Sequence, residues 1–149
     1  MELFLSCLVK DLFALNFIES YKELNEKVIL NVDDDSMNQL VMEKILEVAG
    51  VKTIGVRNGA AAVRKLMEGF RPDAILMDLQ MPVMGGVEAS QKIKLWIDAN
   101  VPIIINSGDI TESDKETLNS LGIFDFLVKP YNQIDILETL QKNIVVVQE

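Results

Sequence analysis

Short apolar runs alternate with stretches of helical periodicity from Lys27 to the end of the chain. Each apolar run has the length of a strand, and each stretch after it places apolar residues three and four positions apart. Such alternation is typical of repeated βα units around a parallel sheet. The pattern therefore predicts an α/β domain. We expect strands near 28–32, 52–56, 73–77, 102–106 and 124–128, and helices near 36–49, 58–69, 86–98, 111–121 and 132–145.

The first of these helices carries local signals at both ends. Asp35 or Ser36 is placed to cap its N-terminus, and Gln39 follows Ser36 at the spacing of a capping box. Gly50 stands after the last turn, where glycine commonly ends a helix. We therefore expect a helix with sharp boundaries.

Residues 1–26 precede the βα pattern and form a predicted helical extension. The extension is too apolar to stay in water unpaired, so we expect it to cover a face of its own domain or to pair with a partner chain, including a second copy. Its apolar stripe consists of Leu5, Leu8, Leu12 and Leu15, with Phe13 and Phe17 beside it.

A membrane function for this extension is less well supported. A secretory signal would begin with positive charge, whereas this segment begins with Glu2. A spanning helix would place Lys10 and Asp11 at its centre, and we expect no span. A helix lying on a membrane surface is the alternative, weakened by the lack of Lys and Arg on a polar face.

The predicted strands end in groups that suit phosphoryl chemistry. An acidic triplet, Asp33 to Asp35, follows the first strand, and Asp78 follows the third. Ser107 follows the fourth strand and Lys129 follows the fifth. In open α/β sheets, ligands bind beyond the carboxyl ends of the strands, so we expect these groups to share one crevice. Carboxylates, a hydroxyl and an ammonium together are suited to phosphoryl transfer with Mg²⁺.

Each of these residues also has a purely structural interpretation. An acid after a strand can simply cap the next helix, and we assign Asp35 that role. Capping needs only one such residue, so Asp33, Asp34 and Asp78 are better explained as ligands of Mg²⁺. Ser107 and Lys129 are weak signals alone, because Ser-Gly and Lys-Pro pairs are common in turns.

Composition narrows the possible functions of the 149 residues. The net charge of −9 argues against direct nucleic-acid binding, which needs clustered Lys and Arg. The absence of histidine excludes Ser-His-Asp catalysis and His-ligated zinc, and any phosphohistidine donor must be another protein. Cys7 is the only cysteine, which fits a reducing compartment, so we expect a cytoplasmic protein.

Together these motifs resemble the receiver domain of two-component response regulators. The resemblance rests on Asp33-Asp34, the segment from Asp78 to Gly86, Ser107-Gly108 and Lys129-Pro130, and it covers about residues 27–146 of a domain that we place at 27–149. It implies a flavodoxin-like, doubly wound fold with strand order 2-1-3-4-5 and helices on both faces. The domain would catalyse its own phosphorylation and slow autodephosphorylation.

The resemblance also implies a role for each site residue. Asp78 would accept a phosphoryl group from a histidine kinase or a histidine phosphotransfer protein. Asp33 and Asp34 would form the acidic metal pair, and the Gln80 carbonyl would complete the protein ligands of Mg²⁺. Lys129 would contact the phosphate. Ser107 and Phe126 would be the switch residues, and the face built from residues 108–145 would be the output surface or a second possible dimer interface.

Three residues depart from the family pattern. Gly85 stands where the family often has Asp, which would loosen the loop after Asp78. Asn31 and Asn106 lie in strands that are usually apolar there, and both need buried hydrogen-bond partners. Two other functions stay open: a receiver-like binding module that signals without phosphorylation, and a Mg²⁺-dependent phosphohydrolase.

Overall fold

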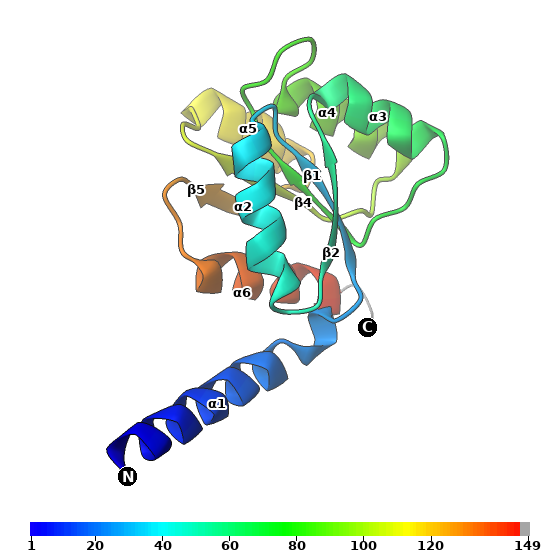
Figure 1. Cartoon of the computed structure of the whole chain (residues 1–149). Coiled ribbons are helices and arrows are strands. Elements are labelled where there is room, and N and C mark those ends of the chain that lie inside the picture. Colours follow the sequence, from blue (N-terminus) through cyan, green and yellow to red (C-terminus); the bar gives the residue numbers. More distant parts are fainter. Residues whose placement is uncertain (147–149) are drawn as a thin grey trace.

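Five parallel strands form the centre of the domain in the computed structural model, which describes residues 1–146. Their order is β2-β1-β3-β4-β5, so the first strand pairs with both the second and the third. The predicted sheet and its order 2-1-3-4-5 are therefore confirmed (Figure 1). The strands are β1 (Val28–Val32), β2 (Lys52–Val56), β3 (Ala74–Met77), β4 (Ile103–Ser107) and β5 (Phe126–Val128).

Helices follow the strands along the chain, as the periodicity predicts. The predicted helix near 86–98 is divided, because its last turn is a π-helical turn, η2 (Ile93–Ile97). Residues 147–149 of the predicted domain at 27–149 lie outside the described part of the chain. The helices are α1 (Glu2–Ser20), α2 (Ser36–Glu47), α3 (Gly59–Met67), α4 (Gly86–Lys92), α5 (Glu112–Ser120) and α6 (Gln133–Val146), with a 3₁₀ turn, η1 (Lys22–Leu24).

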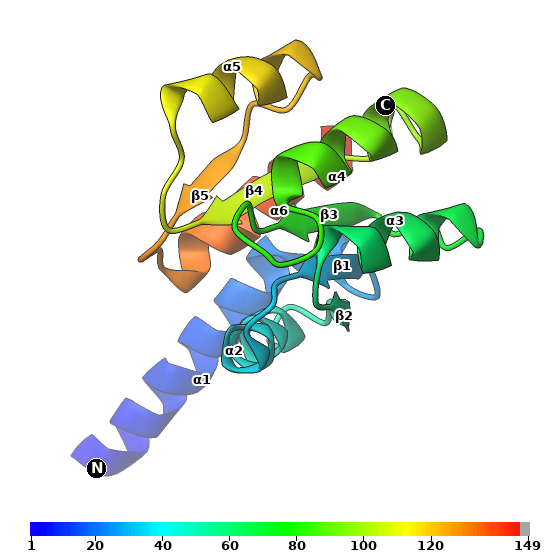
Figure 2. The same cartoon turned by 90° about the horizontal axis from the view of Figure 1, so that it is seen from above.

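The sheet is covered on both faces, which explains why its inner strands are apolar throughout. Helices α2 and α6 pack on one face, and α3, α4 and α5 pack on the other (Figure 2). Each apolar cluster joins helix and strand side chains that are almost fully buried. The first includes Ile29, Leu46, Leu76, Ile104, Leu137 and Leu140, and the second includes Leu30, Leu66, Ile75, Ile93, Ile105 and Leu118.

Asp35 caps the N-terminus of α2, and it is one of the two residues that the sequence predicted for this role. Its carboxylate accepts hydrogen bonds from the backbone N–H groups of Met37, at 2.8 Å, and Asn38, at 3.2 Å. The predicted capping box between Ser36 and Gln39 is wrong, because Asp35 already satisfies the free N–H groups of the first turn. The Gln39 side chain does not cap the helix and instead contacts the backbone at the ends of β1 and β2.

Helix α1 extends from the base of the domain and contacts it only at its C-terminal end (Figure 1). Within the described chain, Phe17 is the one α1 residue that is not exposed, and it packs against the cluster that holds α2 and α6. The prediction of a helix is confirmed, but α1 does not cover a face of its own domain. No helix among residues 1–146 is long and apolar enough to cross a bilayer.

Candidate functional site

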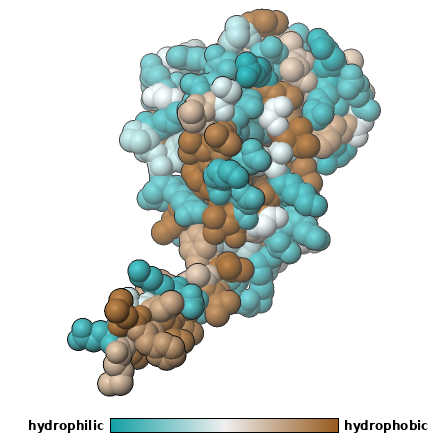
Figure 3. Space-filling view, in the orientation of Figure 1, coloured by the Kyte–Doolittle hydropathy of each residue, from teal (hydrophilic) through white to brown (hydrophobic). Residues whose placement is uncertain are grey.

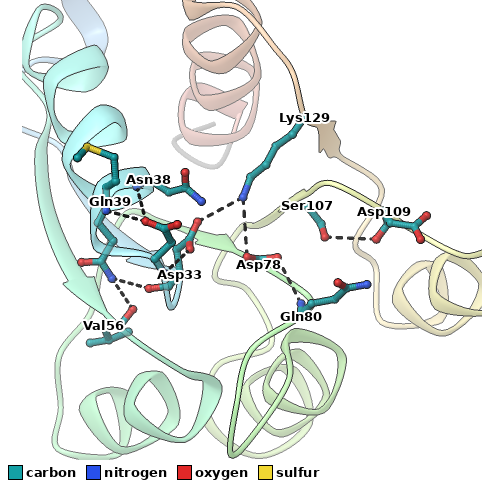
Figure 4. A network of polar contacts seen from close by, with 11 residues as sticks. Asp33, Asn38, Gln39, Val56, Asp78, Gln80, Ser107, Asp109 and Lys129 are labelled. Atoms are coloured by element: carbon teal, nitrogen blue, oxygen red, sulfur yellow. Dashed lines mark hydrogen bonds and ion pairs between the residues drawn. The ribbon is translucent and has the colours of Figure 1, made fainter.

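The carboxyl ends of four strands meet at one edge of the sheet and carry the predicted site residues. Asp33 follows β1, Asp78 follows β3, Ser107 is the last residue of β4, and Lys129 follows β5. Since all these strands are parallel and adjacent, their ends deliver the four side chains to one crevice (Figure 4). The arrangement is the one expected for a ligand site in an open α/β sheet.

Three carboxylates lie together in this crevice. One oxygen of each of Asp33, Asp34 and Asp78 falls within 4.8 Å of the others. Asp33 is 2% exposed and Asp78 is 8% exposed, whereas Asp34 is open to solvent. Three acids held this closely repel one another unless a cation or a proton lies between them. The donor set of three carboxylate oxygens, with one side open, fits the ligand preference of Mg²⁺.

Lys129 reaches back across the crevice toward two of these acids. Its Nζ lies 3.4 Å from Oδ2 of Asp33 and 3.8 Å from Oδ2 of Asp78. The backbone holds it there, because the N–H of Lys129 donates to the carbonyl of Ser107 at 3.1 Å. A fixed ammonium beside a carboxylate can bind a further anionic group placed between them.

The electrostatic balance at Asp78 is unfavourable to its charge. Burial raises the pKa of the Asp78 carboxyl above its ordinary value, and the neighbouring Asp33 raises it further. Lys129 and the backbone N–H of Gln80, which donates to Oδ1 of Asp78 at 3.3 Å, lower the pKa but do not cancel the effect of burial. A bound cation would favour the ionised form that the protein alone disfavours.

The loop after Asp78 turns tightly into α4. A Cβ on Gly86 would collide with the backbone carbonyl of Asp78, so glycine is required at this position. Gly85 starts α4 without a side-chain cap. Two backbone hydrogen bonds hold the loop, from Gly86 to Leu79 at 3.0 Å and from Gly59 to Met84 at 2.9 Å. The predicted loosening by Gly85 is therefore opposed by main-chain contacts at both ends of the loop.

Gln39 is a site residue that the sequence reasoning missed. Its side-chain amide donates to the carbonyl of Asp33 at 2.7 Å and to the carbonyl of Val56 at 2.8 Å (Figure 4). It thereby ties the ends of β1 and β2 together directly behind the acidic cluster. A Cβ on Gly55 would collide with the Gln39 amide oxygen, so this contact needs a glycine in β2. An isolated glycine within a strand was the available signal, since it often marks a close approach.

Ser107 and Phe126 lie near the crevice but do not touch the acids in this state. Ser107 is 1% exposed, and its hydroxyl donates to the carbonyl of Asp109 at 3.3 Å, away from Asp78 (Figure 4). Phe126 is half-buried and packs against the cluster under α3, α4 and α5. In this arrangement the Ser107 hydroxyl is therefore bonded to the following loop and not to Asp78.

The two strand asparagines are buried, as their positions predict. Asn31 and Asn106 are each 2% exposed. Among the described residues, the side-chain oxygen of Asn106 has no hydrogen-bond partner. An unsatisfied buried acceptor costs about 1–3 kcal/mol. Asn106 therefore carries a stability cost within one strand residue of Ser107.

Comparison with known proteins gives a consistent result. A sequence model of the response regulator receiver domain matches residues 29–141. The chain is 34% identical over 117 residues to the chemotaxis protein CheY of Thermotoga maritima, with 78% of this chain and 96% of that protein covered. It is also 32% identical over 119 residues to the sensor protein GacS of Pseudomonas syringae, but this match covers 76% of the chain and only 13% of GacS.

A solved structure of similar sequence has the same fold. It is the receiver domain of a sensor histidine kinase from Pseudomonas aeruginosa, described with a magnesium ion coordinated in its active site cleft. The two chains are 35% identical and superpose with a TM-score of 0.72, covering 80% of this chain and 98% of that one. Helix α1 and η1 lie outside the residues that match the family model.

Proposed function

Because this chain belongs to the response-regulator receiver family, we propose that Asp78 accepts a phosphoryl group from a phosphohistidine on another protein. One observation carries the proposal most strongly. The buried Asp78 carboxylate lies 3.8 Å from the Lys129 ammonium and, within 4.8 Å, beside the carboxylates of Asp33 and Asp34. A nucleophile that lies close to both a fixed cation and a metal-binding cluster is the arrangement that phosphoryl transfer needs.

The transfer is an in-line displacement at phosphorus. An oxygen of the Asp78 carboxylate forms the new O–P bond while the P–N bond of the phosphohistidine breaks. The electron pair of that bond stays on the imidazole nitrogen, which takes up a proton as it leaves. Lys129 neutralises the oxygens of the group in transit, because its Nζ already lies 3.8 Å from the nucleophile. Attack by water on the acyl phosphate later releases inorganic phosphate and restores the carboxylate.

Mg²⁺ fits the same cluster. Asp33, Asp34 and Asp78 would hold it, with the Gln80 carbonyl as a further ligand and with waters in the remaining positions. When bound, the ion supplies positive charge for the phosphoryl oxygens, as metal ions generally do in phosphoryl transfer. The protein supplies the positions of the acids, which Gln39 and the capped turn at Asp35 fix. A magnesium ion in the similar receiver from Pseudomonas aeruginosa supports this assignment.

The donor protein would approach from the side of α2. A cavity of about 310 Å³ opens beside Lys129, and apolar groups of α2 surround it. The exposed side chains of Met37 and Val41 extend this apolar surface across α2. A histidine carried on an apolar helix face could pack here and present its phosphoryl group to the crevice. The cavity is lined by Asn38, Val41, Met42, Ile45, Lys129, Pro130 and Tyr131.

The conformational response to phosphorylation would take place at Ser107 and Phe126, on the other side of the site from α2. A phosphoryl group on Asp78 offers acceptors that compete with the carbonyl of Asp109 for the Ser107 hydroxyl. A turn of Ser107 toward Asp78 would free space for Phe126 to move inward. The face built from residues 108–145 would then change, and it is our candidate for the output surface. A ligand shifts such an equilibrium only by its different affinity for the two states.

A small phosphodonor tests the proposal. The full chain is incubated with Mg²⁺ and acetyl phosphate, and its intact mass is measured over time. We expect the addition of one acid-stable, base-labile phosphate, and no addition with EDTA. No phosphate uptake with Mg²⁺ present would favour the phosphorylation-independent binding module. Continuous release of phosphate from unrelated phosphate esters would favour the phosphohydrolase.

A further inference from the structure

Helix α1 presents a long apolar surface that its own domain leaves uncovered. Its 19 residues span about 28 Å and leave the domain at one end. Figure 3 shows hydrophobic side chains over much of this helix. Of its large apolar side chains, nine are between 45% and 89% exposed: Leu3, Phe4, Leu5, Leu8, Val9, Leu12, Phe13, Leu15 and Ile18. Single exposed leucines are ordinary, but a contiguous surface of this kind marks an interaction site.

The surface has the spacing of a helix that pairs with another helix. Leu5, Leu8, Leu12 and Leu15 follow one another at intervals of three, four and three residues, which are the core positions of a heptad repeat. Half of the positions that flank this stripe are also apolar. They carry Phe4, Val9 and Ile18, together with Glu2, Asp11 and Asn16.

The outward positions of the same repeat carry both polar and apolar residues. Ser6, Lys10 and Ser20 lie there with the small residues Cys7 and Ala14. Leu3 and Phe13 are the large apolar residues on this side of the free part of the helix. The helix is therefore apolar over most of its surface, and the leucine stripe is the row whose spacing suits a partner helix.

The base of α1 is fixed to the domain, so this face is held in a defined direction. The ring of Phe17 meets the ring of Tyr21 edge to face, with 5.1 Å between their centroids. The side chain of Gln141 in α6 donates to the carbonyl of Ser20 at 3.0 Å. A partner of α1 would therefore be coupled mechanically to α6.

We propose that the partner of this face is the α1 helix of a second copy of the chain. Two such helices bring the same four leucines against each other, which matches the core of a two-stranded coiled coil. Each strip is about 28 Å long and about 10 Å wide, so the pair buries well under the roughly 1,600 Å² of a standard interface. The association is therefore reversible and depends on protein concentration. It is independent of the proposed phosphorylation chemistry, because α1 lies outside residues 29–141.

A lipid surface fits the same helix less well. Lys10 and Asp11 lie halfway along it, and no row of Lys and Arg borders the apolar face. The chain also carries a net charge of −9, which an anionic membrane would repel. The same charge repels a second copy, so salt weakens the repulsion in both kinds of contact, and binding to vesicles is what distinguishes them. Screening should strengthen an apolar pairing between two acidic chains.

Sedimentation of the full chain over a range of concentrations and at two salt concentrations tests the proposal. We expect the weight-average mass to rise toward a dimer, and to rise at lower protein concentration in the higher salt. Leu12→Glu should abolish this increase. Phe13→Glu is the matched control, because it adds the same charge to the neighbouring residue on the outward side, and it should retain the association of the wild type.

Three results would overturn the proposal. The first is a wild-type chain that stays monomeric at every concentration. The second is equal loss of association in Leu12→Glu and Phe13→Glu. The third is a monomer that cosediments with vesicles of phosphatidylcholine and phosphatidylglycerol, which would assign the face to lipid. Thermal melting of both variants shows whether the domain is folded, since both substitutions lie outside its core.

Discussion

The Nζ of Lys129 lies 3.8 Å from Oδ2 of Asp78, although the two residues follow different strands of the sheet. This ion pair offsets only part of the cost of burying the carboxylate, because the pKa of Asp78 is still raised. The site is therefore strained electrostatically before any phosphodonor or cation arrives. The uncompensated burial of Asp78 should affect the stability of the protein and its affinity for Mg²⁺.

Asp78→Asn should stabilise the metal-free protein near neutral pH. A raised pKa means that the folded state holds the proton more tightly, so wild-type stability falls as the pH rises above 3.8, the ordinary value, toward the raised value. The neutral amide avoids this loss, which is about 1.4 kcal/mol for each unit of pKa shift. Urea unfolding of the variant and of wild type in EDTA, at several pH values, measures the difference in their free energies of unfolding. The advantage should shrink as the pH approaches 3.8, and an advantage that does not change with pH would contradict the explanation.

Asp34→Ala should weaken Mg²⁺ binding while leaving the domain folded. Asp34 is exposed, so its removal costs little packing and relieves repulsion within the acidic cluster. In wild type, Mg²⁺ at a hundred times its dissociation constant should stabilise the fold by about 2.7 kcal/mol. Melting curves with and without Mg²⁺ measure that gain. The variant should show a smaller gain and, without metal, a melting temperature at least as high as that of wild type. Equal Mg²⁺ affinity in both proteins would exclude Asp34 as a ligand.

Gln39→Met and Gly55→Ala should each weaken Mg²⁺ binding, because both disrupt the contact of the Gln39 amide behind the acidic cluster. Methionine removes the amide that joins Asp33 to Val56, and the new methyl group at residue 55 displaces that amide. Each change releases the acidic turn and takes the Gln39 donor from the Asp33 carbonyl, whereas the Val56 carbonyl keeps the N–H of Asp33, at a cost of about 1–3 kcal/mol in stability. Because both act on one contact, the double variant should bind Mg²⁺ about as well as Gln39→Met alone.

Titration of wild type, the two single variants and the double variant with Mg²⁺ tests whether Gln39 and Gly55 act through one contact. Leu40→Ala is a suitable control, since Leu40 is 47% exposed on the same helix. Losses that simply add in the double variant would show that Gln39 and Gly55 act separately. Losses of stability without any change in Mg²⁺ affinity would leave Gln39 with a structural role only.

Ser107→Ala should separate phosphorylation from its readout. The change removes the hydroxyl that now binds the carbonyl of Asp109 and leaves Asp78 and Lys129 in place. Phosphate uptake should continue, but the surface from 108 to 145 should no longer respond. Amide NMR before and after phosphorylation measures the response of each residue. Shifts of wild-type size across this surface in the variant would exclude Ser107 as the switch, whereas shifts confined to the surroundings of Asp78 would support it.

The sequence predicts most of the site because the chemistry lies where strands end. Apolar runs locate the strand ends, and parallel topology then brings Asp33, Asp78, Ser107 and Lys129 to one edge. The contact of Gln39 could not be predicted in the same way. Local spacing favoured a capping box, and only the tertiary proximity of β2 shows that its amide bridges two strand ends.

The N-terminal helix illustrates a second limit. The leucine stripe predicts a helix that needs an apolar partner, but spacing alone does not tell whether that partner is the domain itself. The direction in which α1 leaves the domain depends on the packing of Phe17 and Tyr21 and on the contact between Gln141 and Ser20. The contact between Gln141 and Ser20 joins residues far apart in the chain. The direction of the Ser107 hydroxyl is likewise a property of the fold rather than of the motif.

Trapping the acyl phosphate at its site tests the role of Asp78 most directly. The chain is phosphorylated with acetyl phosphate and Mg²⁺ and then reduced with borohydride, which converts an aspartyl phosphate to homoserine. Peptide mass mapping locates the converted residue, and unphosphorylated protein treated in the same way is the control. We predict homoserine at Asp78 and at no other position. Homoserine at Asp33 or Asp34, or phosphate uptake by Asp78→Asn at the wild-type rate, would contradict the assignment of Asp78 as the phosphoacceptor.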